Sequence, residues 1–213
     1  MSADGKIADR SRSAARFGSP HDKAHLERQI AQADAVVFGA GTLRAYGTTL
    51  RVSDPALLAL RQSLGKPLQP VQIVCSESAV FDLSWPFFHQ PVPRWLLTTP
   101  RGCDRWQVES PFEKILVAEQ TASGIDWPFA LEQLHALGLE RLAVLGGGTL
   151  TAGLLAEDLL DEIWLTLCPL LLGGVDAPTP IEGVGFLQTD APRLQLLEAI
   201  VQEQEVFLHY RVL

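Results

Sequence analysis

The sequence predicts an α/β domain built on a largely parallel sheet. Short apolar runs of strand length alternate along the 213-residue chain with longer segments of helical periodicity. Two of the predicted strands end in glycine-rich turns that open a helix, as is common in α/β folds. The last two strands have no helix between them, so we expect an antiparallel pair at the edge of the sheet.

The helices are predicted from their start and stop signals. Ser19-Pro20 and Asp54-Pro55 each place a capping side chain before a proline, the preferred order at a helix start. Gly65 and Gly138 end two of the helices. The predicted helices cover residues 21–33, 54–64, 127–137 and 149–157.

The strands are predicted where short runs of apolar and β-branched residues lie between turn signals. They cover residues 34–38, 71–75, 94–98, 114–118, 141–145, 162–168, 193–201 and 205–212. The proline-rich stretch around Pro86 to Pro93 is interpreted as a loop. Neither repeats nor a linker interrupts the chain, so residues 1–213 are predicted to form one domain.

Composition restricts the class of partner. Hydrophobic residues make up 47% of the chain, and the formal net charge is −8. An acidic protein is a poor partner for nucleic acid or for an anionic membrane. The apolar stretches are too short for a membrane span, and no signal peptide is visible. Three cysteines without CxxC spacing favour a reducing, cytosolic compartment.

The segment VLGGGTLTAGLL, from Val144 to Leu155, is the most informative in the chain. Gly146, Gly147 and Gly148 end a strand, and Thr149 and Leu150 open a helix. Glycines at such a turn let the backbone approach a bulky group and leave N–H groups pointing outward. A phosphate fits this position because the helix dipole favours negative charge there.

A second turn of the same kind occurs earlier, in ADAVVFGAGTL, where Gly39, Gly41 and Thr42 follow a buried strand. Two such turns in one domain suggest an elongated ligand with phosphates, such as a dinucleotide. The alternative is that the glycines only permit tight packing of helix against sheet. The GxGxxG fingerprint is incomplete, since Thr151 stands where its last glycine would be, and no GxxxxGK[ST] loop is present.

Four blocks of the chain together resemble the reductase domain of bacterial riboflavin biosynthesis, whose fold is similar to dihydrofolate reductase. The blocks are SADGKIA (Ser2–Ala8), DAVVFGAGTLRA (Asp34–Ala45), VLGGGTLTAGLL, and LCPLLLGG with the following APTP (Leu167–Pro180). The resemblance implies a dihydrofolate-reductase-like fold, a homodimer, and NADPH as the cofactor that reduces the ribosyl group of a pyrimidine phosphate to a ribityl chain. The motifs of the zinc deaminase domain often fused to such reductases are absent.

The same resemblance assigns roles to individual residues. Thr42 and the turn Gly146–Leu150 would contact NADPH, and Ser76 would lie near its adenosine end. Lys6 would face the substrate, where its charge stabilises negative charge or holds a phosphate. The alternative for Lys6 is an ordinary exposed lysine in a turn.

Three positions depart from the family pattern. Tyr46 stands where relatives have an acidic residue, Leu145 replaces a glutamate before the glycine turn, and Ile30 replaces an arginine. We expect either that Arg16, His21 and Arg51 supply the missing substrate contacts or that the substrate differs. No basic residue follows Ser76 closely, so the choice of NADPH over NADH comes from the resemblance alone.

Two further expectations concern the chain start and metals. Relatives carry a strand immediately before the SxDGK block, where this sequence has Met1. We therefore expect a natural start upstream; if the chain does begin at Met1, the sheet lacks this central strand. His21 and His25 have zinc-ligand spacing but no third ligand, so no metal site is predicted.

Three functions follow from these observations. The first is a cytosolic NADPH-dependent reductase of a ribosylamino-pyrimidine phosphate, similar to 5-amino-6-(5-phosphoribosylamino)uracil reductase. The second is a dihydrofolate-reductase-like enzyme that acts on another small heterocycle or carbonyl compound. The third is a catalytically silent nucleotide-binding module.

Overall fold

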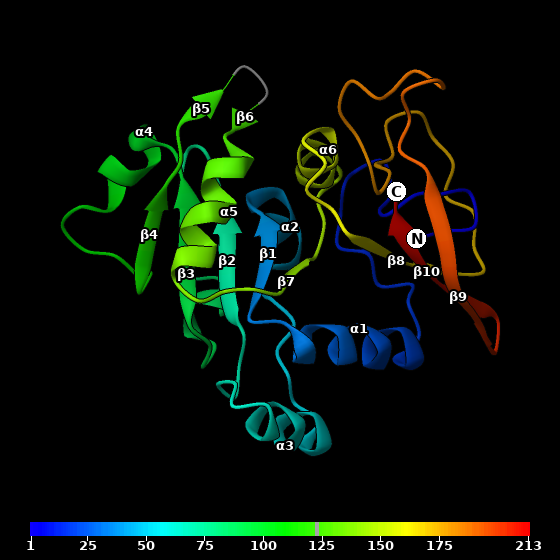
Figure 1. Cartoon of the computed structure of the whole chain (residues 1–213), viewed down its shortest axis with the longest axis horizontal. Coiled ribbons are helices and arrows are strands. Elements are labelled where there is room, and N and C mark those ends of the chain that lie inside the picture. The colour runs from blue at the N-terminus through cyan, green and yellow to red at the C-terminus, as the bar shows by residue number, and fades with distance from the viewer. Residues whose placement is uncertain (122–123) are drawn as a thin grey trace. The chain divides into compact units, whose positions relative to one another are not determined.

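The computed structural model describes residues 1–121 and 124–213 (Figure 1). The chain divides into two compact units, one of residues 24–146 and one that joins residues 1–23 to residues 147–213. The first is called the parallel unit below and the second the antiparallel unit, after their sheets.

The parallel unit contains a five-stranded sheet in the order β4-β3-β2-β1-β7, in which every neighbouring pair is parallel (Figure 1). The strands are β1 (Ala35–Gly39), β2 (Val71–Cys75), β3 (Arg94–Thr98), β4 (Lys114–Val117) and β7 (Leu142–Val144). β1 is flanked by β2 and β7, with Ala35 opposite both Val71 and Leu142. Its first four residues are buried, as expected for an interior strand of a parallel sheet.

Helices and short elements surround this sheet. They are α2 (Ala40–Tyr46), α3 (Pro55–Ser63), α4 (Pro100–Cys103), α5 (Trp127–Ala136), the 3₁₀ turns Pro86–His89 and Asp104–Trp106, and the small hairpin β5 (Gln120–Thr121) and β6 (Gly124–Ile125). α1 (Pro20–Gln32) begins in the antiparallel unit and ends in the parallel unit. The core of the parallel unit includes Phe38 and Phe87, whose rings meet edge to face at 5.8 Å.

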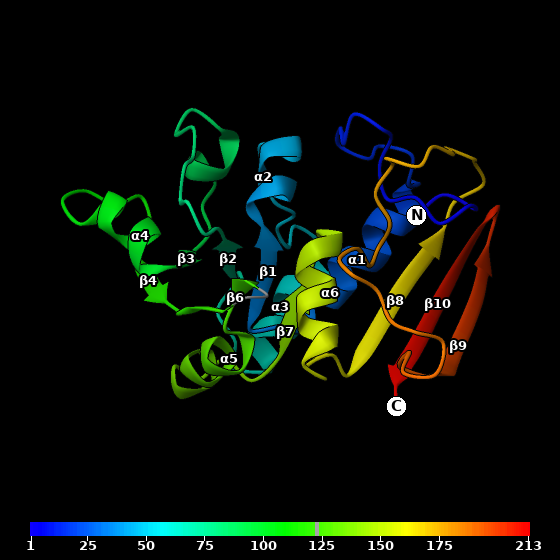
Figure 2. The same cartoon turned by 90° about the horizontal axis from the view of Figure 1, so that it is seen from above.

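The antiparallel unit contains the sheet β8-β10-β9, built from β8 (Glu162–Leu167), β10 (Glu205–Val212) and β9 (Leu194–Gln202). Figure 2 shows the three strands side by side. α6 (Gly148–Ala156) precedes this sheet in the chain. The chain start adds one parallel bridge, Ser2 to Cys168, and the N–H of Cys168 donates to the carbonyl of Met1.

The α/β class, the parallel sheet and the antiparallel C-terminal strands are confirmed. Two details differ from the prediction. The antiparallel strands are three rather than two and form a sheet of their own, because β10 pairs with β8 as well as with β9. α2 begins directly after Gly39, so Gly41 and Thr42 lie in the first turn of a helix rather than in a separate turn.

Arg61 of α3 is a fully buried side chain that the sequence did not single out. Its Nη1 donates to the carbonyls of Ala31 and Ala33 at 3.0 and 2.7 Å, and its Nε donates to the carbonyl of Pro67 at 2.7 Å. Burial lowers the pKa of this guanidinium from its ordinary value. Arg61 therefore satisfies carbonyl groups that the end of α1 leaves without a helical partner.

Arg61→Met is expected to destabilise the protein by about 2 kcal/mol, because the methionine fills the volume but leaves buried carbonyls without donors. Urea unfolding measures the loss. The exposed neighbour Gln62 provides the control, since Gln62→Met should change stability by less than about 0.5 kcal/mol. Equal stabilities for the two variants would contradict this role of Arg61.

Candidate active site

Three predicted cofactor positions meet at one edge of the parallel sheet. Gly39 lies opposite Cys75 in the register, so Ser76 follows at the same edge. The N–H of Gly39 donates to the carbonyl of Gly146 at 3.4 Å. Positions 39, 76 and 146 are far apart in the sequence, and the parallel pairing of β2, β1 and β7 brings them together.

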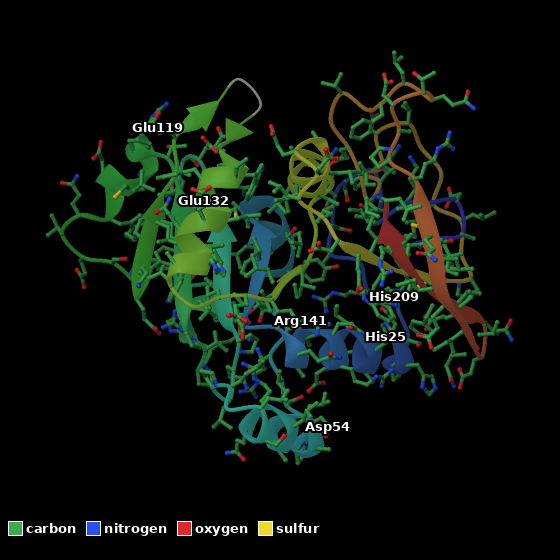
Figure 3. All side chains as sticks on the ribbon, in the orientation of Figure 1. His25, Asp54, Glu119, Glu132, Arg141 and His209 are labelled. Carbon is green, nitrogen blue, oxygen red and sulfur yellow. The ribbon has the colours of Figure 1, made fainter. Side chains whose placement is uncertain are left out.

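This edge is the carboxyl end of the strands, at a point where the strand order changes direction. From β1 the chain places β2, β3 and β4 successively on one side, and then returns to place β7 on the other. In open α/β sheets, ligands bind outside the carboxyl ends of the strands at such a point. Figure 3 shows Arg141 at the opposite end, just before β7, where its N–H donates to Asp34.

The glycines at this edge leave open space. A Cβ built on Gly39, Gly41 or Gly146 would have no atom within 4 Å. Gly39 has φ −78°, which any residue adopts, so neither packing nor backbone geometry requires a glycine there. Gly146 and Gly147 have φ of 79° and 77°, a region that favours glycine. Tight packing of helix against sheet therefore does not explain the glycines at positions 39 and 41.

The helices that follow the two glycine turns lack the caps that the other helices have. Ser19, Asp54, Thr99 and Asp126 accept hydrogen bonds from N–H groups in the first turns of α1, α3, α4 and α5. α2 and α6 start instead from Gly39 and Gly147, and neither glycine provides a side-chain cap. N–H groups at these two helix starts are thus available to an anionic ligand, so the residues present fit a phosphate-bearing cofactor.

The rest of the second glycine turn has mixed roles. Gly148 is buried, and a Cβ there would come within 2.5 Å of the carbonyl of Thr179 and of the side chain of Glu182. Tight packing therefore explains Gly148. Thr149 is exposed, whereas Leu150 is buried and packs as a core residue.

Ser76 is buried, and its hydroxyl accepts a hydrogen bond from the N–H of Ala79 at 3.0 Å. Its carbonyl accepts from the hydroxyl of Thr98 at 2.6 Å. Ser76 therefore shapes the turn after β2, whatever contact it makes with a ligand.

Lys6 lies in a loop of the antiparallel unit that is held at two points. Its Nζ donates to the carbonyl of buried Ala177 at 3.0 Å. Asp4 accepts from the hydroxyl of Ser2 at 2.6 Å and from the N–H groups of Leu172 and Gly173 at 3.1 and 2.6 Å. The blocks SADGKIA and LCPLLLGG–APTP, which are distant in the sequence, are thus joined by hydrogen bonds.

Asp4 is a functional candidate that the sequence reasoning missed. The hydroxyl of Ser2 and the two backbone N–H groups lower the pKa of its carboxyl to about 2. The signal was present as an acidic residue two positions before Lys6, but nothing local pointed to its partners near residue 172.

The four residues predicted to contact substrate are placed as follows. His21 lies on α1, with its Nε2 3.2 Å from the carboxylate of Glu203, and Arg16 is exposed. These two belong to the antiparallel unit, whereas Tyr46 and Arg51 are exposed residues of the parallel unit. None of the four is buried, and a substrate-binding role for them stays a prediction.

Two of the departures from the family pattern have a packing explanation. Ile30 is fully buried in the core, and Leu145 packs against the same core. The N–H of Leu145 also donates to the carbonyl of Val37 at 2.8 Å, which extends the pairing of β7 with β1. The apolar side chains at positions 30 and 145 therefore add to the core, where the family pattern has an arginine and a glutamate.

A cavity of about 460 Å³ lies elsewhere, at the start of β8 and the end of β10. Its lining carries three carboxylate side chains and one guanidinium, and it contains none of the predicted site residues. The lining residues are Asp158, Leu160, Asp161, Glu162, Arg211, Val212 and Leu213. Carboxylates repel a phosphate, so this cavity is a poor cofactor site.

Within residues 1–121 and 124–213, no three His, Cys, Asp or Glu side chains gather in a way that would hold a metal ion. Among the same residues, none of the helices has the length and apolar character to cross a membrane.

The open parallel sheet, with glycines at the carboxyl ends of β1 and β7, is an arrangement found in many α/β enzymes. The model of the RibD C-terminal domain matches residues 1–208, and this chain belongs to that family.

Individual relatives agree with this membership. The chain is 33% identical over 187 residues to a 2,5-diamino-6-ribosylamino-4(3H)-pyrimidinone 5′-phosphate reductase of Archaeoglobus fulgidus, covering 88% of this chain and 85% of the relative. It is 27% identical to the protein of the same name from Methanothermobacter thermautotrophicus, covering 100% and 94%. A pyrimidine reductase-like protein of Corynebacterium diphtheriae shares the fold, with a TM-score of 0.78, 24% identity, and coverage of 100% and 89%.

Lowering the pH is expected to remove the stability that Asp4 contributes. Because its pKa is depressed in the folded state, this contribution is complete above about pH 4, the unfolded value, and is lost as the pH falls through about 2. Thermal unfolding of the native protein and of Asp4→Asn, followed from pH 6 to pH 2, measures it. The native protein should melt higher at pH 6, and the difference should shrink below pH 4. A difference in melting temperature that does not change with pH would contradict a stabilising role for the ionised carboxylate of Asp4.

Proposed function

We propose that this chain is an NADPH-dependent reductase of a ribosylamino-pyrimidine 5′-phosphate in riboflavin biosynthesis. The names of the archaeal relatives support the substrate class, since both are reductases of such a phosphate. One observation supports the cofactor assignment above the others. The helices α1, α3, α4 and α5 have side-chain caps at their N-termini, whereas α2 and α6 start from glycines and have none.

The carboxyl edge of the parallel sheet would hold the cofactor. The N–H groups at the start of α2 would meet a phosphate, with Gly39 and Gly41 leaving room for it. The turn at Gly146–Leu150 would offer the same chemistry at the start of α6. When bound there, NADPH would supply the hydride for C1′ of the opened ribosyl group, and a proton from solvent would complete the reduction to the CH₂ of a ribityl chain.

Lys6 would act on the substrate. Its side chain is half-buried, and its ammonium group donates to the neutral carbonyl of Ala177, a contact that leaves its positive charge available to an anion. A substrate phosphate, or negative charge that develops as the sugar opens, would be stabilised by it. Asp4 would keep the loop in place through its bonds to residues 172 and 173.

The pyrimidine base has two candidate forms. The archaeal relatives are named for the 2,5-diamino-pyrimidinone, and a Thermotoga maritima protein that shares the fold is named for the 5-amino-uracil. We favour the diamino form, because the Archaeoglobus relative is 33% identical over most of the chain. A cytosolic location and the preference for NADPH over NADH stay predictions.

An assay of NADPH oxidation separates the proposal from its competitors. Turnover with either pyrimidine phosphate supports it, and the ratio of kcat/KM for the two identifies the base. Turnover only with other heterocycles or carbonyl compounds would indicate the broader reductase class. NADPH binding without turnover on any substrate would indicate the silent module.

Gly39→Val and Gly41→Ala test the cofactor position. Each side chain enters empty space, so neither variant should unfold the protein. Gly41→Ala should even raise stability, by up to about 1 kcal/mol, because alanine favours the helix. Both should weaken NADPH binding, Gly39→Val by about tenfold or more. Fluorescence titration measures the NADPH affinity and thermal unfolding measures the stability. Unchanged NADPH affinity in both variants would contradict a cofactor site at this glycine turn.

Lys6→Ala tests the substrate role. Loss of its charge should lower kcat about a hundredfold or more, while NADPH affinity stays the same. Arg10→Ala is the control, since Arg10 is an exposed cation in the same loop. If Lys6→Ala and Arg10→Ala have equal kcat, Lys6 is only a turn residue.

A further inference from the structure

The four residues that follow β2, from Ser76 to Ala79, form a turn at the edge of the sheet where the cofactor is proposed to bind. We call it the β2 turn. The hydroxyl of Ser76 accepts from the N–H of Ala79, and the carbonyl of Ala79 accepts from Nε1 of Trp106, both at 3.0 Å. Thr99, which follows β3, donates its hydroxyl to the carbonyl of Glu77 at 3.0 Å. Hydrogen bonds within the turn and from the next strand connection therefore fix its backbone.

The β2 turn also packs tightly against α4. A Cβ built on Gly102 would come within 2.7 Å of the carbonyl oxygen of Glu77 and within 3.2 Å of Cβ of Ala79. Ala79 is fully buried and has φ 48°, in the left-handed region that few residues other than glycine adopt. The fold therefore sets the position of residue 77, and the side chain of Glu77 is exposed there.

The chain carries negative charge at this edge of β2. Residues 76–83 include the acidic residues Glu77 and Asp82 and contain neither lysine nor arginine. The neighbouring strand β1 ends at Gly39, and residues 40–43 after it are uncharged. A ligand group with two negative charges would thus find no counterion within either of these two segments.

The position of Glu77 bears on which nicotinamide cofactor fits. In dinucleotide-binding α/β folds the phosphates lie at the glycine turn after one strand, and the adenosine ribose lies near the end of the next. An acidic residue there accepts from the 2′-hydroxyl of NADH, whereas an arginine accommodates the 2′-phosphate of NADPH. In this chain β1 ends in the glycine turn, its parallel neighbour β2 places Cys75 opposite Gly39, and Glu77 follows shortly after Cys75.

We propose that Glu77 accepts a hydrogen bond from the adenosine ribose and weakens binding of a 2′-phosphate, so that this chain binds NADH about as tightly as NADPH. The inference rests on the proposed function, from which it takes the cofactor site. A carboxylate repels the 2′-phosphate of NADPH at close range. NADH has a hydroxyl in that place, which donates a charge-assisted hydrogen bond to a carboxylate. The family resemblance predicts a preference for NADPH, and Glu77 is the feature of this chain that opposes it.

Fluorescence titration of the full chain with NADH and with NADPH tests this proposal by binding alone. The dissociation constants of the native protein for the two cofactors should lie within about tenfold of each other. Glu77→Gln removes the repulsion and keeps an acceptor for the ribose hydroxyl, so the ratio of the two constants should shift about tenfold toward NADPH. Glu113→Gln is the matched control, because Glu113 is an exposed glutamate directly before β4, at the opposite end of the sheet. It should leave both constants unchanged.

A native protein that binds NADPH far more tightly than NADH, or a Glu77→Gln variant with the native ratio, would overturn the proposal. Arg101→Gln provides a second reading, because Arg101 is an exposed cation next to Gly102, which packs against the β2 turn. A selective loss of NADPH affinity in this variant would identify Arg101 as a ligand of the 2′-phosphate and would also overturn the proposal. Tight binding of NADPH alone leaves the proposed function standing, whereas binding of neither cofactor contradicts that function as well.

Discussion

The parallel pairing of β1 with both β2 and β7 is the constraint on which the candidate site depends. β1 is the first strand of its sheet in the chain, and the last one, β7, returns beside it. That return places Gly146 within hydrogen-bonding distance of Gly39, although more than a hundred residues separate them. Without it, the two glycine turns would be unrelated features of the sequence.

The N-terminal caps distinguish α2 and α6, which we propose bind the cofactor, from the helices that have a side-chain cap. Glycine at an N-cap costs a helix only a few tenths of a kcal/mol relative to a capping side chain, so it is a cheap replacement. The chain uses such caps at Asp54, Thr99 and Asp126 and omits them at Gly39 and Gly147. The omission costs stability in the free protein, and a bound phosphate would recover it by accepting from the same N–H groups.

Much of the parallel unit could be predicted from the sequence, because its signals are local. The two residues Asp54-Pro55 predict the start of α3, and the apolar run before Gly39 predicts β1. α4 was missed although Thr99-Pro100 carries the same signal, because four residues are too few to show periodicity. The strand β8 was predicted, but its antiparallel pairing with β10 and the partners of Arg61 were not, since both depend on contacts between segments distant in the sequence.

The candidate site was predictable to the same extent. The glycine turns and Lys6 are visible in the sequence as motifs. The sequence does not show that Gly39 borders open space whereas Gly148 is tightly packed. A side chain at Gly39 meets empty space and one at Gly148 meets a backbone carbonyl, which only the folded chain can show. The hydrogen bonds of Asp4 could not be predicted for the same reason, because its carboxylate accepts from the N–H groups of Leu172 and Gly173, which are distant in the sequence.

Hydrogen–deuterium exchange with and without NADPH tests the central claim most directly, because it reports on the backbone N–H groups themselves. Protection of the amides of residues 40–42 and 147–150 on addition of NADPH is the result that this account predicts. Unchanged exchange at both glycine turns, with protection elsewhere or nowhere, would contradict it.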